Sequence, residues 1–252
     1  MNARTMPRPR IVAVVLAYNC ARMLARAHGR IPKDLVDGIF VMDDGSTDDT
    51  FEAARVLGLT VFRHGQNRGY GGNLKEGLRR ASEAGADYVL EVHGDGAQFN
   101  PQALRVSLDA MQRGAQLILG SRFEEPKRAL ENGMPIIRFV ANRLLSIVDR
   151  LVLRLPLADF HTGFRVYGRR LLENVPYDEN SNDYLFSFQI IAQAAYYRMP
   201  VAQVPVDADY NSEHTSQPMG AAIVYAIQTF WTLGQYLLAV SGLRYNRIFQ
   251  RR

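Results

Sequence analysis

The chain has 252 residues, which suits one large domain or one domain with an appended segment. Apolar residues make up 47% of it, so a full hydrophobic core can form, which argues against global disorder. The net charge of +5 suits anionic partners, but the arginines are spread along the chain rather than gathered in one stripe, and we expect no nucleic-acid partner.

Cys20 is the only cysteine, so an internal disulfide is excluded and a reducing compartment, the cytoplasm, is expected. The first apolar run follows Arg8 and Arg10 and ends by Asn19, so we expect no signal peptide.

Short apolar runs predict five strands in the first half of the chain, at residues 11–17, 39–42, 59–62, 87–92 and 117–119. The segments between them predict helices, with Ser46 or Thr47 as the cap of the second helix and Asn100 as the cap of a later one. This alternation of strand and helix is typical of an α/β unit with a mostly parallel sheet.

Polar or charged side chains stand at the ends of four of these strands. Asn19 follows the first strand, Asp43 and Asp44 follow the second, Asp95 follows the fourth, and Arg122 follows the fifth. The carboxyl ends of parallel strands share one edge, and open α/β sheets bind their ligands there. We therefore expect these side chains to converge on one site.

Asp95 stands between Gly94 and Gly96, which allow a ligand to approach the backbone closely. A carboxylate in this position is a hard oxygen ligand, suited to Mg²⁺ or Mn²⁺ carrying a diphosphate. Taken alone, Asp95 would more often be a loop acid that caps the next helix. The polar residues at the ends of the other strands favour the interpretation of Asp95 as a metal ligand.

A glycine-rich segment follows the third strand. Residues 67–73 are Asn-Arg-Gly-Tyr-Gly-Gly-Asn, and a helical pattern follows them to about residue 84. Backbone N–H groups before a helix can meet a phosphate or a sugar. The glycine spacing fits neither the dinucleotide fingerprint nor the Walker loop, so this segment alone gives weak support for a nucleotide site.

Residues 123–134 are charged and contain Pro and Gly, which is typical either of a mobile lid beside a site or of a plain solvated connection. After a predicted helix over 135–155, Asp159, His161 and Arg165 lie within seven residues. Asp159 could be a general base or could hold His161 in one tautomer, and Arg165 could clamp a phosphate. The alternative is a structural Asp–Arg pair with an incidental histidine.

The last part of the chain predicts a helix over 183–197, a strand over 201–206 and then a long uncharged helix, since no charged residue occurs between Thr215 and Leu243. This helix could pack on the core or dimerise, lie in a membrane interface with Trp231 and the terminal arginines at the lipid surface, or span the bilayer. We divide the chain into a domain of residues 1–216 and a C-terminal amphipathic helix with a basic tail, residues 217–252.

Seven segments, in this order, resemble family 2 glycosyltransferases of the GT-A fold: VVLAYN, VMDDGSTDDT, NRGYGGNLKEGL, HGDG, GSRF, DFHTGFRVYGRRLL and VPVDADYNSEHTS. They are most similar to the branch that contains dolichyl-phosphate mannose synthase and bacterial polyprenyl-phosphate glycosyltransferases. The resemblance implies a Rossmann-like, mostly parallel sheet flanked by helices. It also implies a nucleotide-diphosphate sugar donor and a Mg²⁺ or Mn²⁺ cofactor.

The resemblance implies the roles of single residues as well. His93 stands where the family has the first acid of an Asp-x-Asp motif; it could bind the metal, which favours Mn²⁺, or face the sugar. Asp95 and His93 are the predicted metal ligands, and Asp159, His161 and Arg165 the predicted catalytic residues. The predicted nucleotide-sugar site consists of Tyr18, Asn19, Asp43, Asp44, Gly69, Gly71, Gly72, Asn73, His93, Gly94 and Arg122.

The resulting hypothesis is a metal-dependent inverting glycosyltransferase whose acceptor is a polyprenyl phosphate or another lipid-linked or glycan acceptor. A polyprenyl phosphate is already an anion, whereas a hydroxyl acceptor needs a base, for which Asp159 and His161 are the candidates. The alternatives are transfer to a soluble hydroxyl acceptor and a non-catalytic module that binds a nucleotide sugar or a membrane.

A nucleotidyltransferase is disfavoured, because Tyr18 to Ala21 stand where such enzymes usually carry a basic, glycine-rich loop. We expect a cytoplasmic protein. Peripheral contact with the inner face of the cytoplasmic membrane and a homodimer are further hypotheses.

Overall fold

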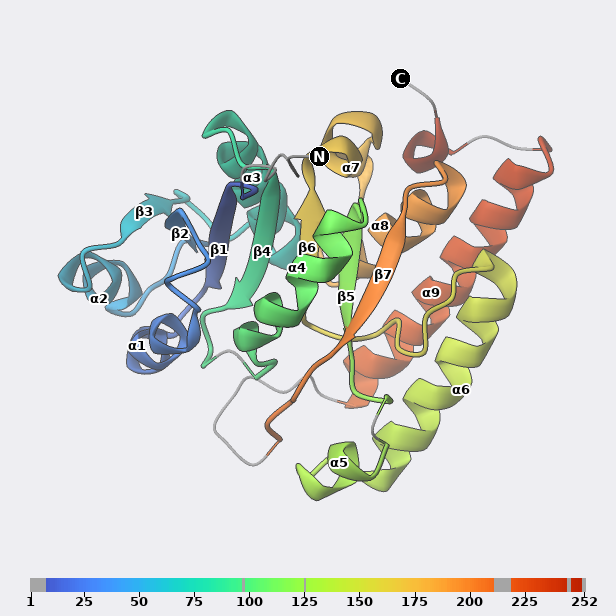
Figure 1. Cartoon of the computed structure of the whole chain (residues 1–252), viewed down its shortest axis with the longest axis horizontal. Coiled ribbons are helices and arrows are strands. Elements are labelled where there is room, and N and C mark those ends of the chain that lie inside the picture. The colour runs from blue at the N-terminus through green and yellow to red at the C-terminus, as the bar shows by residue number, and fades with distance from the viewer. Residues whose placement is uncertain (1–7, 97, 125, 211–218, 244–245, 251–252) are drawn as a thin grey trace, which may run out of the picture.

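The computed structural model describes residues 8–96, 98–124, 126–210, 219–243 and 246–250. In this part of the chain, seven strands form one sheet in the order β3-β2-β1-β4-β6-β5-β7, with helices on both of its faces (Figure 1). The strands are β1 (Ile11–Ala17), β2 (Gly38–Asp43), β3 (Thr60–Arg63), β4 (Tyr88–His93), β5 (Leu117–Ser121), β6 (Arg165–Gly168) and β7 (Val201–Pro205).

The helices alternate with the strands along most of the chain. They are α1 (Ala21–Arg30), α2 (Thr50–Val56), α3 (Tyr70–Glu83), α4 (Leu104–Gln112), α5 (Pro126–Glu131), α6 (Ile136–Leu153), α7 (Arg169–Asn174), α8 (Phe186–Tyr196) and α9 (Met219–Val240). Short 3₁₀ helices occur at η1 (Pro101–Ala103), η2 (Tyr177–Glu179) and η3 (Arg247–Phe249).

The sheet is mostly parallel, as the sequence predicts. The pairs β1–β2, β1–β4, β2–β3 and β5–β7 are parallel, whereas β6 runs antiparallel to both of its neighbours, β4 and β5. The sequence did not predict β6, because this strand has only four residues and begins at Arg165, directly after a polar segment. Its reversed direction means that the chain enters β6 from the edge at which β4 and β5 end.

The sheet has a hydrophobic core on each face, and strand β1 shows the alternation. Val12 and Val14 belong to a buried cluster with residues of α3, α7, α8 and α9. Ile11, Ala13 and Val15 belong to the opposite cluster, with residues of α1 and α4. Because both faces of the sheet are covered, the central strands are continuous apolar runs. A site must therefore form where the strands end.

Two local predictions are wrong. Residues 123–134 contain the helix α5 rather than a loop without secondary structure. Neither Ser46 nor Thr47 caps α2, which begins at Thr50; the Asp48 side chain instead accepts a hydrogen bond of 3.0 Å from the Thr50 amide. The chain turns once more after the predicted cap before the helix begins.

The cap predicted at Asn100 is confirmed, since its side chain accepts a hydrogen bond of 3.1 Å from the Gln102 amide. Proline follows it at the first helical position, where its missing N–H has no cost.

Helix α9 packs against the rest of the protein. Leu233, Tyr236 and Ala239 on this helix, and Phe249 after it, are buried in the same cluster as residues of α3 and α8. Among the described residues, Gly220–Val240 is the helix that is long and apolar enough to cross a membrane by length and composition. The boundary predicted at residue 216 therefore coincides with a change in amino-acid composition. The described residues of 217–252 share a hydrophobic core with the preceding part of the chain.

Candidate active site

The sheet register brings the predicted site residues to one edge. Ala17 of β1 pairs with Asp43 of β2, and Leu16 pairs with His93 of β4, so these three strands end together. β5 is reversed twice relative to β4, through β6, and therefore also ends at this edge, at Ser121. The convergence expected from the sequence is present.

The loops after β1 and β2 are joined by side-chain hydrogen bonds. Asn19 has a left-handed backbone, with φ of 48°, and its side-chain oxygen accepts a bond of 2.8 Å from the Thr47 amide. The Asn19 amide donates to the Ser46 hydroxyl at 3.0 Å, and Asp43, which is fully buried, accepts from the Ser46 amide at 2.9 Å. Asn19 and Asp43 thus fix the shape of this part of the edge, where Tyr18 is half exposed.

Asp44 supports the glycine-rich segment. Its carboxylate is 3% exposed and accepts a hydrogen bond of 2.8 Å from the Arg68 amide, while burial raises its pKa. Gly69, with φ of 80°, precedes α3, and Gly71 and Gly72 lie inside its first turn rather than before the helix as predicted.

The glycines of this segment are required by contacts within the protein. A Cβ added to Gly71 would lie 2.4 Å from the carbonyl oxygen of Ser181, and one on Gly69 would lie 2.7 Å from that of Asn182. Asn73 is also engaged, because its side chain donates to the Met42 carbonyl at 2.8 Å. The contact of these residues with a nucleotide stays a prediction.

Gly94 has a similar structural role. A Cβ there would lie 2.8 Å from the Leu16 carbonyl oxygen and 3.0 Å from Sγ of Cys20. The glycine therefore allows the end of β4 to pass close to the end of β1, which places the half-buried Asp95 beside the β1 and β2 loops.

A buried carboxylate, which the sequence did not predict as part of the site, lies on β4 two residues before the end of that strand. Glu91 of β4 is 2% exposed and accepts hydrogen bonds from the hydroxyls of Tyr70 and Tyr167, the latter at 2.6 Å. His93 Nε2 lies 3.0 Å from its Oε1, and a guanidinium nitrogen of Arg165 lies 3.7 Å from its Oε2. The signal available in the sequence was a charged residue inside an otherwise apolar strand.

The charges around Glu91 determine its ionisation. Burial alone would raise its pKa, but Arg165 and His93 outweigh that effect and lower the pKa to about 2. Burial would lower the pKa of His93, and Glu91 reverses the shift, so that the pKa of His93 is raised. Glu91 is therefore a carboxylate facing two basic groups.

The donor set fits a divalent cation only in part. Asp95 supplies one carboxylate at the end of β4, as Mg²⁺ and Mn²⁺ sites that also use substrate phosphates require. His93 directs Nε2 at Glu91, as a metal-binding histidine commonly does with its second ring nitrogen, so Nδ1 would be the ligand atom and the role of His93 stays a prediction. In the described part of the chain, no three His, Cys, Asp or Glu residues come together to hold a metal. A cation at Asp95 would therefore depend on the donor diphosphate for further ligands.

Arg122 and Asp159 form a buried ion pair. The guanidinium Nε and Nη2 of Arg122 donate to the two carboxylate oxygens at 2.6 and 2.8 Å, and the Arg122 amide adds a third bond of 3.2 Å. Burial raises the pKa of Asp159, but Arg122 outweighs it and leaves the pKa below its usual value. Asp159 is thus a tightly held carboxylate, in an arrangement that does not suit a general base.

The ring of His161 lies between helices α6 and α9, while its amide donates to the Asp159 carboxylate at 3.1 Å. Its Nε2 is 2.9 Å from Oδ2 of Asp149 on α6, and its Nδ1 is 3.3 Å from the hydroxyl of Tyr225 on α9. Asp149 is fully buried, and its burial raises its pKa against the opposing effect of His161. Both ring nitrogens of His161 therefore face protein groups.

Arg165 is buried within the sheet rather than directed at the edge. It is 4% exposed, lies opposite Glu91 in the β4–β6 register, and donates to the Tyr70 hydroxyl at 3.4 Å. Direct contact between Arg165 and a phosphate, which the sequence predicted, has no support in this geometry.

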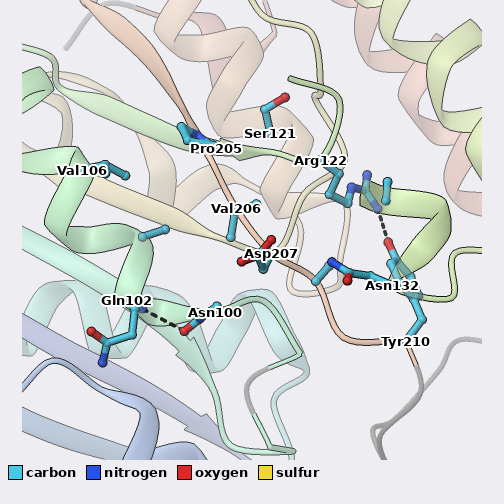
Figure 2. A pocket seen from close by; sticks show the side chains of 13 residues that line it. Asn100, Gln102, Val106, Ser121, Arg122, Asn132, Pro205, Val206, Asp207 and Tyr210 are labelled. Carbon is cyan, nitrogen blue, oxygen red and sulfur yellow. Dashed lines mark hydrogen bonds between the residues drawn. The ribbon is translucent and has the colours of Figure 1, made fainter. Parts of the chain in front are cut away.

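A cavity of about 240 Å³ adjoins Arg122. Asn100 and Gln102 of the η1 region line one side of it, and Asp207 and Tyr210, which follow β7, line another (Figure 2). Arg122 Nη1 donates to the Tyr210 hydroxyl at 2.9 Å, which fixes the guanidinium at the cavity wall. The edge thus has two parts: the ends of β1, β2 and β4, and a polar hollow beside β5 and β7.

Solved structures share this fold. Glucosyl-3-phosphoglycerate synthase from Mycobacterium tuberculosis, crystallised with Mn²⁺, uridine diphosphate and glucosyl-3-phosphoglycerate, superimposes with a TM-score of 0.64 at 20% identity, over 94% of this chain and 82% of that chain. At this identity the likeness concerns the fold, and it confirms the predicted GT-A class.

Sequence relatives agree with the predicted branch. Polyprenol monophosphomannose synthase from Mycolicibacterium smegmatis is 28% identical over 229 residues, covering 88% of this chain and 85% of the relative. UDP-N-acetylglucosamine–dolichyl-phosphate N-acetylglucosaminyltransferase from Methanococcus voltae is 23% identical over 240 residues, covering 88% and 94%. The profile of glycosyl transferase family 2 matches residues 12–175, well over half of the chain. With this match, the fold and the strand-edge site in agreement, the chain belongs to glycosyl transferase family 2.

Proposed function

We propose that this glycosyltransferase moves a sugar from a nucleotide-diphosphate sugar to a polyprenyl phosphate, with inversion at the anomeric carbon and with Mg²⁺ or Mn²⁺ as cofactor. The two relatives whose names specify dolichyl phosphate or a polyprenol monophosphate product support the acceptor class. Nucleotide and metal in the crystals of the fold neighbour support the donor class. The reaction would take place at the cytoplasmic face of a membrane, where such acceptors are embedded.

The observation that carries the acceptor proposal is the state of the two candidate bases. Asp159 is held by three hydrogen bonds from Arg122, and both ring nitrogens of His161 face Asp149 and Tyr225. A hydroxyl acceptor needs a base to take its proton, and neither of these two predicted bases is placed to do so. A phosphate acceptor is already an anion and needs none, so this geometry favours the phosphate.

The reaction would then be a single displacement. An oxygen of the acceptor phosphate forms a bond to the anomeric carbon as the bond from that carbon to the donor diphosphate breaks, and the nucleoside diphosphate leaves with the electron pair. A metal at Asp95 would neutralise the charge of the departing diphosphate. The loops fixed by Asn19 and Asp43 would hold the nucleoside, and the guanidinium of Arg122, paired with Asp159, would lie beside the acceptor.

Thermal unfolding with Mn²⁺ and a panel of UDP-, GDP-, dTDP- and CDP-sugars tests the donor side. A ligand at about 100 times its dissociation constant stabilises the folded state by about 2.7 kcal/mol. We expect a metal-dependent shift with one nucleotide class that is lost in Asp95→Ala and kept in Asp109→Asn, a change of an exposed acid on α4. A wild-type protein that no nucleotide sugar stabilises would contradict the proposal and favour a non-catalytic module.

A transfer assay with the identified donor tests the acceptor side. We expect a glycosyl phosphate with inverted configuration when polyprenyl phosphate is supplied, and no product from the matching polyprenol. Product from an alcohol alone would show that the acceptor is a hydroxyl and that the roles assigned here to Asp159 and His161 are wrong.

A further inference from the structure

Exposed apolar side chains gather on two neighbouring helices. Ile137, Leu144 and Leu151 on α6 are 69%, 59% and 72% exposed, and Ile223, Ile227 and Trp231 on α9 are 59%, 63% and 67% exposed. The spacings of seven and of four residues place each set along one side of its helix. We name these six residues the α6–α9 face. Exposed apolar side chains along two helices that contact each other mark an interaction site.

The opposite sides of both helices are packed on the domain. α6 buries Ser146, Asp149 and Leu153, and α9 buries Leu233 and Tyr236, while the two helices lie side by side at one end of the sheet (Figure 1). α9 is long and apolar enough to cross a bilayer, yet one side of it is covered by protein. The face therefore suits a partner that lies against it rather than one that surrounds the helix.

The exposed charges on α6 and α9 themselves are of one sign. Residues 219–243 contain no charged residue, and Asp149, the only acid within 135–155, is fully buried beside His161. The charged side chains that α6 and its end expose are the arginines Arg138, Arg150 and Arg154. An apolar face with a basic rim complements an anionic lipid surface, whereas a second copy would bring two basic rims together.

We propose that the α6–α9 face docks on the surface of an anionic phospholipid bilayer, with its apolar side chains at the acyl boundary and the arginines at the headgroups. This inference rests on the proposed function, because a lipid-embedded acceptor must reach the site. The helices are tied to the site residues: Phe139 of α6 contacts Phe123, next to Arg122, with ring centroids 5.4 Å apart, and Tyr225 of α9 contacts His161. Docking of the face thus brings the Arg122 side of the edge to the lipid.

Sedimentation with vesicles tests the proposal on the full chain. We expect binding to phosphatidylcholine vesicles that contain about 30% phosphatidylglycerol, and much weaker binding to phosphatidylcholine alone. Arg138→Gln with Arg150→Gln should weaken binding about 25-fold, since each arginine near an anionic surface contributes about fivefold. The matched control is Arg113→Gln, an exposed arginine outside the face.

The apolar part of the face is tested by Ile227→Glu with Trp231→Glu, which should abolish vesicle binding. Val56→Glu is the control, because Val56 is 86% exposed on α2, away from the face. Stabilisation by Mn²⁺ and nucleotide sugar should be unchanged in all of these variants. Loss of vesicle binding with that stabilisation intact supports the inference, while vesicle binding without any nucleotide response would overturn the proposed function and leave the docking surface standing.

Two results would overturn the inference. One is a wild type that binds neither kind of vesicle at low salt. The other is a stable dimer in sedimentation velocity that Ile227→Glu with Trp231→Glu dissociates, which would assign the face to contact between two copies of the chain.

Discussion

Glu91 shows how a single buried residue connects the strands and helices next to the site. Its carboxylate joins Tyr70 on α3, Tyr167 and Arg165 on β6, and His93 on its own strand. The sequence shows a charged residue in an apolar strand, but the groups that face it depend on the antiparallel partner β6, which the sequence did not predict. For the same reason Arg165 was predicted to bind phosphate, although it serves as the buried counter-ion.

Replacement of this carboxylate measures its structural role. Glu91→Gln leaves Arg165 buried without its anion, and breaking a buried pair costs about 3–5 kcal/mol. We expect a loss of that order in urea unfolding. Glu52→Gln, in an exposed pair with Arg55, is the control and should change stability by less than about 1 kcal/mol. Equal losses of stability in the two variants would show that the buried Glu91 pair stabilises the protein no more than the exposed pair does.

Acidification should reproduce part of this effect. The folded pKa of Glu91 is about 2, below its ordinary value of 4.5, so the folded state binds the proton less tightly than the unfolded chain. The contribution of Glu91 is therefore fully present above pH 4.5 and is lost as the pH falls toward 2, by about 3 kcal/mol in total. The difference between the urea midpoints of wild type and Glu91→Gln should shrink steadily as the pH falls from 5 to 3; a constant difference would contradict the assignment.

At the scale of elements, the strands that end at the site were predictable and the contacts between distant elements were not. The apolar runs predicted β1, β2, β4 and β5, because a strand that is covered on both faces of the sheet is a nearly continuous run of apolar residues. The short β6 and the helix α5 carry mixed, polar sequences and were missed. The glycines before and within α3 were assigned to a ligand, whereas two of them make room for the backbone of residues 181 and 182.

The start of α3 offers a test of this close approach. Gly71→Ala would place Cβ 2.4 Å from a backbone oxygen, and such overpacking typically costs about 1–3 kcal/mol. Gly29→Ala, on α1, meets nothing within 4 Å and should stabilise the protein by about 0.5–1 kcal/mol through better helix propensity. Denaturant unfolding of both variants checks the opposite signs. A neutral Gly71→Ala would mean that residues 181–183 can move away.

For the whole molecule, the C-terminal part belongs to the core. Composition suggested a separate helix and tail, because the charge-free stretch begins near residue 216. The fully buried Phe249 of η3, however, contacts the rings of Tyr196 and Tyr236 at centroid distances of 5.2 and 6.0 Å. The spacing of apolar residues shows which side of a single helix is buried, but it does not show which other element covers that side. The contact of Phe249 with α8 and α9 could therefore not be predicted.

Phe249→Ala should therefore destabilise the entire protein. Removal of a buried phenylalanine costs about 3–5 kcal/mol, and unfolding should remain a single transition, with fluorescence and circular dichroism changing together. Two separate transitions, or a stability equal to that of wild type, would show that the tail is an independent unit.

The strand order has a consequence for how the protein is made. The strands β1, β2, β3 and β4 lie within residues 11–93 and pair side by side. The other strands, including β6, which pairs with the free side of β4, complete the sheet only when residue 205 is available. A ribosome that has released the first part of the chain has thus supplied every strand that positions Asn19 and Asp43, long before Arg122 can meet Asp159. The two sides of the site would be assembled one after the other during synthesis, and the side proposed to bind the donor would form first.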